Sequence, residues 1–275
     1  MVEDSILKSI SDDISEGRTE GLPQRILSIC ESEDDPMEIL KCMSLLKLLP
    51  SSDAENRIAM RLRELADDDN GFTIASALQN LDCPLFAIEV LDKIKKSDRN
   101  TRLKCSCLYD LEEYESAFDL YGKIENKCVN DRILLSRFQS ALGEHTMSVQ
   151  TSAELLSEYP KDYDVRVAYA NSMMMAGHDK ELLKYAREGL KDKSADSLAV
   201  AAYIFRILGK TNAAGNYAAQ AIKADNSHIG AMETLGICLA MKGEYQKAKI
   251  TAGAINEISP GNKAVINILA YCDGH

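Results

Sequence analysis

A pair of helices that recurs every 32 to 34 residues is the feature that most constrains this chain. The clearest unit covers residues 229–262, and its first half has apolar residues at helical spacing from Met232 to Leu239. Gly243 follows, a residue type that takes up the left-handed conformation of a helix end at little cost. A second helix runs on to Pro260, because the residue before a proline avoids the α region. The unit therefore predicts an antiparallel helix hairpin.

The same pattern begins three more times upstream, at steps of 34, 32 and 34 residues. Two helices whose axes lie about 8–10 Å apart leave room for little more than a Cβ atom where they cross. Small residues stand at these places in each unit: Gly236, Ala202, Ala170 and Ser136 in the first helices, and Ala248 and Ala214 in the second. Upstream of residue 129 the pattern weakens but persists. We expect an all-α protein, a right-handed α-solenoid of stacked antiparallel helix hairpins.

The breaks between helical segments give the expected boundaries. Residues 1–67 are expected to form degenerate helical hairpins. The repeats are expected at about 68–97, 98–128, 129–162, 163–194, 195–228 and 229–262. Residues 263–275 predict one last helix, a lid that is apolar nearly all round. Its apolar surface has two interpretations: a lid whose outward residues are merely tolerated, or a covered end that contacts a second copy or a continuation of the chain.

These units resemble the tetratricopeptide repeat (TPR). The resemblance is carried by Leu235-Gly236, Tyr245, Ala248 and Pro260, which match the pattern of that repeat. The large first residue of the pattern, a tryptophan, is absent, and its place is taken by Met232, Leu198, Arg166 and Arg132. The resemblance implies a superhelix whose first helices line a concave groove, and that this groove holds an extended peptide or a helix of another protein.

By the same resemblance, a set of side chains is expected to face the groove: Arg102, Tyr109, Arg137, Asn171, Met174, Met175, Tyr203, Arg206, Ile207, Ile237 and Met241. Methionine suits an adaptable binding surface, and arginine pairs well with carboxylates. The hypothesis is a partner segment with apolar residues and one or more acidic groups. In the alternative interpretation the methionines pack the hairpin core and the arginines are solvated. Asn171 matches one position of the carboxylate clamp known in this family, but the other clamp residues are missing.

Charge and cysteine content limit the other classes of function. The net charge is −11, and residues 1–70 hold 17 acidic and 8 basic side chains, a balance that repels phosphate backbones and anionic lipids. No CxxC pair occurs among the eight cysteines, which predicts buried free thiols in a reducing cytosol. No apolar stretch approaches about 18 residues, so no membrane insertion is expected. We expect a cytoplasmic protein that does not bind nucleic acid.

Catalytic chemistry finds no support in the sequence. No zinc-protease, nucleophile-elbow or phosphate-loop motif occurs, and no cofactor or metal is expected. Three of the histidines, His145, His178 and His228, are expected to be exposed turn residues, and His275 with Cys272 gives only two metal ligands at a chain end. The leading interpretation is a non-catalytic scaffold or adaptor for protein–protein interaction. The alternative is a structural subunit of a stable complex or homo-oligomer, with self-association through the last helix. A third interpretation, an enzyme, would need a cluster of ionisable residues that the sequence lacks.

Overall fold

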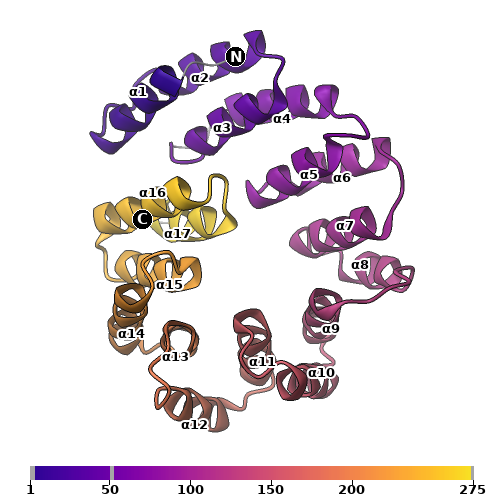
Figure 1. Ribbon diagram of the computed structural model, residues 1–275, viewed down its shortest axis with the longest axis vertical. Helices are drawn as coiled ribbons and strands as arrows, with labels where there is room; N and C mark the ends of the chain where they lie inside the picture. The colour runs from indigo at the N-terminus through magenta and orange to yellow at the C-terminus, as the bar shows by residue number, and fades with distance from the viewer. Residues whose placement is uncertain (1–3, 50–52, 274–275) are drawn as a thin grey trace. The chain divides into compact units, whose positions relative to one another are not determined.

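The computed structural model describes residues 4–49 and 53–273 (Figure 1). In this part of the chain every regular element is an α-helix, and no strand is found. The expectation of an all-α solenoid of antiparallel hairpins is thereby confirmed. The helices follow one another with short connections, and successive helices pack as hairpins.

The first eight helices cover the upstream part of the chain. They are α1 (Asp4–Ser15), α2 (Leu22–Ser32), α3 (Pro36–Leu46), α4 (Asp53–Leu65), α5 (Gly71–Asn80), α6 (Pro84–Lys93), α7 (Asp98–Asp110) and α8 (Tyr114–Tyr121). The other nine are α9 (Val129–Ala141), α10 (His145–Glu158), α11 (Tyr163–Met175), α12 (Asp179–Gly189), α13 (Ala195–Ile207), α14 (Thr211–Ala224), α15 (Ile229–Ala240), α16 (Tyr245–Ile258) and α17 (Lys263–Asp273). Each span expected to be one repeat contains two of these helices. The division into repeats itself stays a prediction.

The chain forms two compact units, and each is described by itself. Unit 1 consists of Met1–Cys107 together with Lys249–His275, and unit 2 of Leu108–Ala248. The boundaries fall inside α7 and α16, so the units do not coincide with the expected repeats. The core of unit 1 is built on large aliphatic side chains that are fully buried, among them Ile26, Ile39, Met43, Ile58 and Leu62.

The last helix, α17, belongs to unit 1 and is largely buried there. Ala264, Val265, Ile268 and Leu269 each have an exposed fraction of 8% or less. Gly261, at the turn before α17, lies close to Leu81 at the end of α5, so that an added Cβ atom would meet the Leu81 side chain at 3.5 Å. The apolar surface expected from the sequence is therefore covered within the chain for most of its residues.

Unit 2 has two layers of helices (Figure 1). We call α9, α11, α13 and α15 the odd-helix layer; successive members of this layer contact one another, and each packs on the following even-numbered helix or on the one before it. The small residues expected at the crossings are buried, including Ser136, Ala170, Ala202 and Ala214. Small side chains at these places allow the close approach that a thin, two-layer unit requires.

The ends of the odd-numbered helices repeat one motif. Gly143, Gly177, Gly209 and Gly243 all have φ between 70° and 81°, the left-handed region. The next residue then donates its backbone N–H to a carbonyl five residues earlier, as from Lys210 to Phe205 at 2.8 Å. Upstream, Asp82 and Glu112 take up the same conformation without being glycine. The glycine stops expected from the sequence are thus present as helix caps.

Candidate protein-interaction surface

The odd-helix layer lies on the inside of the curve of unit 2. Tyr163, at the start of α11, reaches past α13 to α15, and its ring lies 5.0 Å from that of His228 between centroids. It also fills the space beside Gly230, where an added Cβ atom would be 2.2 Å from the phenol oxygen. A side chain can span two hairpins in this way on the side where the helices converge. We call the solvent-facing side of this layer the inner face.

One row of the inner face crosses all four helices at equivalent positions. It consists of Arg137, Asn171, Tyr203 and Ile237, spaced by 34, 32 and 34 residues. Arg137 is exposed, Asn171 and Tyr203 are half-buried, and the Tyr203 hydroxyl donates a hydrogen bond to Asn171 Oδ1. Ile237 was expected in the groove, but its exposed fraction is 2%. That expectation was wrong, because Ile237 packs in the interior of the unit instead of facing solvent.

Arg206 lies one helical turn after Tyr203, and its guanidinium carbon is 5.0 Å above the centre of that ring. Its Nε is buried and has no hydrogen-bond partner. No hydrogen bond or ion pair is found for the rest of its guanidinium, or for that of Arg137, within the described residues. Burial raises the pKa of Tyr203, and the two arginines act against this shift, so both are within electrostatic reach of the phenol.

A second row closes the C-terminal edge of the inner face with apolar side chains. Met175, Ile207 and Met241 occupy equivalent positions on α11, α13 and after α15. Met175 and Met241 are both 48% exposed, and Ile207 is half-buried. Met174, the neighbour of Met175, packs in part against the core of unit 2, and Met173 is buried in that core. The edge combines exposed methionines with the nearby Arg206.

Acidic side chains stand toward the other, N-terminal edge of the same layer. Asp164 is exposed at the start of α11, and Glu233 is half-buried on α15. Glu233 raises the pKa of both Tyr163 and Tyr203, although desolvation is the larger cause in each case. The inner face is therefore divided along the helix axes, with carboxylates near the helix starts and arginines and apolar groups near the helix ends.

Two other expected groove residues, Arg102 and Tyr109, lie on α7. Tyr109 is half-buried in an aromatic cluster, with its ring 5.8 Å from that of Phe138 and 5.3 Å from that of Tyr114. Arg137 lowers the pKa of Tyr109 against the larger effect of burial, so Tyr109 is near the inner face. Arg102 is half-buried in unit 1 and is not part of the surface of unit 2.

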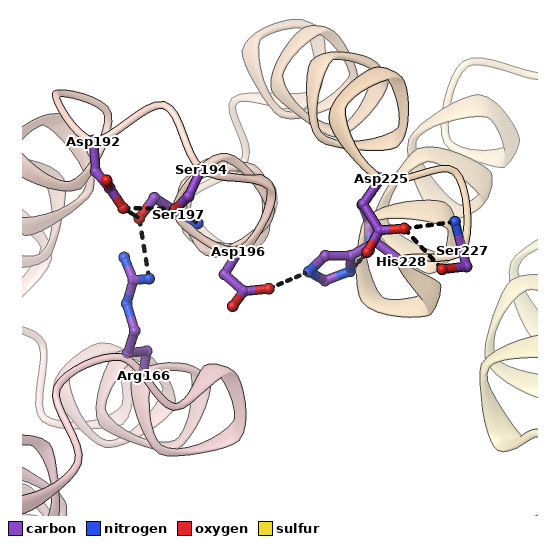
Figure 2. A network of polar contacts seen from close by, with 9 residues as sticks. Arg166, Asp192, Ser194, Asp196, Ser197, Asp225, Ser227 and His228 are labelled. Atoms are coloured by element: carbon purple, nitrogen blue, oxygen red, sulfur yellow. Dashed lines mark hydrogen bonds and ion pairs between the residues drawn. The ribbon is translucent and has the colours of Figure 1, made fainter.

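A polar network ties the starts of the odd helices together (Figure 2). Arg166, in the place of the first large residue of the repeat, is buried and donates to Ser197 at 3.2 Å, and Ser197 donates to Asp192 at 2.8 Å. His228 accepts from the N–H of Ala231 at Nδ1 and lies 3.2 Å from Asp196 through Nε2.

The three histidines expected in turns therefore differ. His178 is exposed, and His145 is half-buried with an unpartnered Nδ1. The expectation of an exposed turn residue was wrong for His228, whose side chain is only 8% exposed. Its ring sits between Tyr163 and the cap of α15, which the sequence alone does not indicate. The side chain of His275 lies outside the described residues.

Other kinds of site are absent from the part of the chain that the structure describes. It contains no group of three or more metal-ligating side chains. None of its helices has the length and hydropathy needed to cross a bilayer. Six of the eight cysteines are buried as free thiols, Cys83 is half-buried and Cys128 is exposed.

Comparisons with known proteins give similarity at the level of helical architecture. No protein-family model matches the chain, and no curated protein does. Among solved structures, MamA from Desulfovibrio magneticus RS-1 is 12% identical over 58% of this chain and 94% of its own, with a TM-score of 0.33. YrrB, described as a TPR protein, is 14% identical over 73% and 90%, with a TM-score of 0.31. The Cut9–Hcn1 assembly of APC/C is 10% identical over 90% and 65%, with a TM-score of 0.36. The interpretation of the inner face is based on its own geometry.

Proposed function

We propose that the chain is a non-catalytic scaffold that binds a segment of a partner protein along the inner face of unit 2. The observation that carries the proposal is a combination on this face: Met175 and Met241 are 48% exposed, and Arg206 and Arg137 have no acidic partner among the described residues. Exposed apolar side chains next to unpaired cations favour a peptide with both kinds of group.

The test is selection of binding peptides from a random library with the full chain, followed by affinity measurements on variants. Met241→Ser changes the inner face, and Met147→Ser on α10 is the matched control, because Met147 is 53% exposed in the other layer. We expect selected peptides to bind Met241→Ser at least several-fold more weakly and Met147→Ser with unchanged affinity. Equal loss in both variants, or in neither, would contradict the placement of the binding surface.

The alternative, a structural subunit of a stable complex or homo-oligomer, has an observation of its own. The C-terminal segment exposes three large side chains in unit 1: Ile250 is 64% exposed, Ile258 47% and Tyr271 44%. Ile250 and Ile258 are eight residues apart on α16, so they lie near one another on one side of the helix. Light scattering separates the two functions, because a particle of 30.3 kDa supports the scaffold and a larger one that Ile250→Glu dissociates supports the subunit.

A further inference from the structure

The chemistry of Arg206 defines what kind of group the partner must present. Its Nε is buried, and no hydrogen bond or ion pair occupies its guanidinium within the described part of the chain. Burying a polar N–H without a partner costs free energy, which a folded protein normally avoids. Arg166, a buried arginine of the same layer, shows the usual outcome, since it is hydrogen-bonded to Ser197 and Tyr185. The terminal nitrogens of Arg206 are not among the buried atoms, and they therefore have a capacity for binding that the chain itself leaves unused.

The surroundings of Arg206 hold its side chain in place from one side. Tyr203 lies beneath the guanidinium, with 5.0 Å between the ring centre and the guanidinium carbon, and its hydroxyl is fixed by Asn171. A stacked arginine has lost much of the side-chain entropy that a carboxylate would otherwise have to restrict. The planar fork of guanidinium is suited to a carboxylate, with two parallel hydrogen bonds.

Charges on the same face set the direction of the partner. Arg137, on α9, is exposed without an ion pair among the described residues and lies within electrostatic reach of Tyr203. Glu233 and Asp164 stand toward the starts of α15 and α11. A carboxylate placed toward the helix starts would meet like charge, whereas one placed toward the helix ends meets Arg206 and the apolar row.

We propose that Arg206, seated on Tyr203, binds a carboxylate of the partner segment, and that an apolar residue next to this carboxylate packs on Met175, Ile207 and Met241. Arg137 binds or attracts a second acidic group toward α9. This inference rests on the proposed function and specifies its ligand: an acidic residue flanked by an apolar one. The carboxylate is that of an Asp or Glu side chain, and a C-terminal carboxylate in its place is an outcome that the test below distinguishes.

The probes are synthetic peptides taken from the library selection, each made with acidic residues, with the same residues changed to Gln or Asn, and with a free or an amidated C-terminus. Binding is measured by fluorescence anisotropy at two salt concentrations. We expect the neutral peptides to bind at least tenfold more weakly, and Arg206→Gln to remove that difference. Loss on amidation alone identifies the C-terminal carboxylate as the source, and loss on the side-chain change identifies Asp or Glu.

Arg187→Gln is the matched control, because Arg187 is an exposed arginine on α12, in the other layer. It is expected to change affinity less than twofold and to keep the preference for acidic peptides. If Arg187→Gln abolished the preference as strongly as Arg206→Gln, general charge attraction would explain the binding, and the proposal would be wrong.

A second readout needs no ligand. Arg206→Met keeps the length of the side chain and removes a buried N–H that has no partner, so the melting temperature is expected to stay equal or to rise. A large fall would show that Arg206 is structural and would overturn the proposal.

The outcomes also separate this inference from the proposed function. The selected peptides could bind Met241→Ser more weakly, bind Arg206→Gln normally and carry no acidic residues. That result would support the scaffold function and contradict the proposed carboxylate ligand. If no selected peptide bound the inner-face variants more weakly, both the proposed function and the carboxylate inference would be wrong.

Discussion

Two hairpins of unit 2 share one backbone plan and differ in what fills it. The hairpin of α13 and α14 has an alanine interior, with Ala201, Ala202, Ala214, Ala218 and Ala221 each at 1% exposure or less. The hairpin of α9 and α10 has serines at corresponding places, among them Ser136, Ser148 and Ser152. A small side chain is what the helix crossing requires, and both residue types satisfy that requirement.

The serine interior adds a second requirement, because each buried hydroxyl needs a partner. Ser148 Oγ donates to the carbonyl of Ser136 at 2.7 Å and lies 2.8 Å and 2.7 Å from the hydroxyls of Ser172 and Ser140. Two nearby polar atoms lack such a partner: Gln139 Oε1 and His145 Nδ1 are buried without a hydrogen bond. Buried polar networks stabilise when complete and destabilise when incomplete. We infer that α9–α10 opens more readily than α13–α14, which amide hydrogen exchange measures directly.

The largest expected effect comes from the contact between α11 and α15. Gly230→Ala would place a Cβ atom 2.2 Å from the Tyr163 hydroxyl, so either the Tyr163 ring must leave its place or α11 and α15 must separate. We expect a loss of about 2–3 kcal/mol in the free energy of unfolding, measured by urea denaturation. Gly215→Ala is the control, because its Cβ atom would meet Cys238 at 3.8 Å, an ordinary contact. A helix-interior alanine there should be neutral or stabilise by up to about 1 kcal/mol. Equal effects in both variants would contradict the close approach of Tyr163.

The next effect tests the serine interior. Ser148→Ala leaves the hydroxyls of Ser172 and Ser140 and a buried carbonyl with fewer partners, and we expect a loss of about 1–2 kcal/mol. The double variant Ser148→Ala, Ser172→Ala removes both sides of one hydrogen bond and should recover part of that loss. Urea denaturation and hydrogen exchange of α9–α10 provide the measurements. A loss in the double variant equal to the sum of the two single losses would show that the hydroxyls are not coupled as described.

The reverse exchange sharpens the comparison. Ala214→Ser introduces a hydroxyl into the alanine interior, where it has no serine hydroxyls as hydrogen-bond partners. It can then donate only to a backbone carbonyl of its own helix. We expect a loss of about 1 kcal/mol, together with faster exchange in α13–α14. No change would mean that the alanine interior tolerates hydroxyls and that the serines of α9–α10 have no special arrangement.

The sequence indicated the hairpins well, because their signals are local. Helix ends are determined by residues such as Gly177 and Gly209, and the small crossing residues repeat at a fixed step. Contacts across hairpins are a different matter. That Tyr163 passes α13 to meet Gly230 depends on the curvature of the layer, which no local pattern specifies. Gly230, the second residue of α15, could have indicated a close approach, but no prediction was made from it.

The candidate surface was predicted only in part, for the same reason. Equivalent positions placed Arg137, Asn171, Tyr203 and Ile237 in one row, but the row does not keep a constant exposure. Ile237 on α15 is 2% exposed, whereas Arg137 on α9 is exposed, although the two positions are equivalent in the repeat. The missing partner of Arg206 Nε could not be predicted, because it depends on the absence of any acceptor within reach.

A smaller effect tests the tie between α13 and α15. His228→Ala removes the cap on the N–H of Ala231 and the contact with Asp196, and we expect a loss of about 1 kcal/mol. Asp196→Asn removes the charge alone and should cost less, since Asp196 is 53% exposed and solvent screens the pair. Thermal unfolding in low and high salt separates the two contributions. A larger loss in Asp196→Asn than in His228→Ala would exclude the cap as the main role of His228.

The smallest effect concerns alkaline pH. Burial is the main cause that raises the pKa of Tyr163, and Glu233 and Tyr203 add to it. The buried phenol favours the protonated form, so its contribution is complete below the unfolded pKa of about 10 and is lost as pH rises above that value. One such tyrosine lowers the free energy of unfolding by about 0.4 kcal/mol at pH 10 relative to pH 8.

Tyr163→Phe keeps the ring beside His228 and removes the ionisable group, so the decline of stability between pH 8 and pH 10 should become shallower by about that amount. Tyr159→Phe is the matched control, because Tyr159 is 40% exposed and follows α10, away from the converging layer. Urea denaturation at each pH gives both slopes. The serine hydroxyls of α9–α10 do not ionise in this range, so the loss assigned to Tyr163 concerns the packing of α11 on α15. Identical slopes for wild type and Tyr163→Phe would mean that the phenol reaches solvent freely and that the convergence of α11 on α15 is looser than the contact with Gly230 requires.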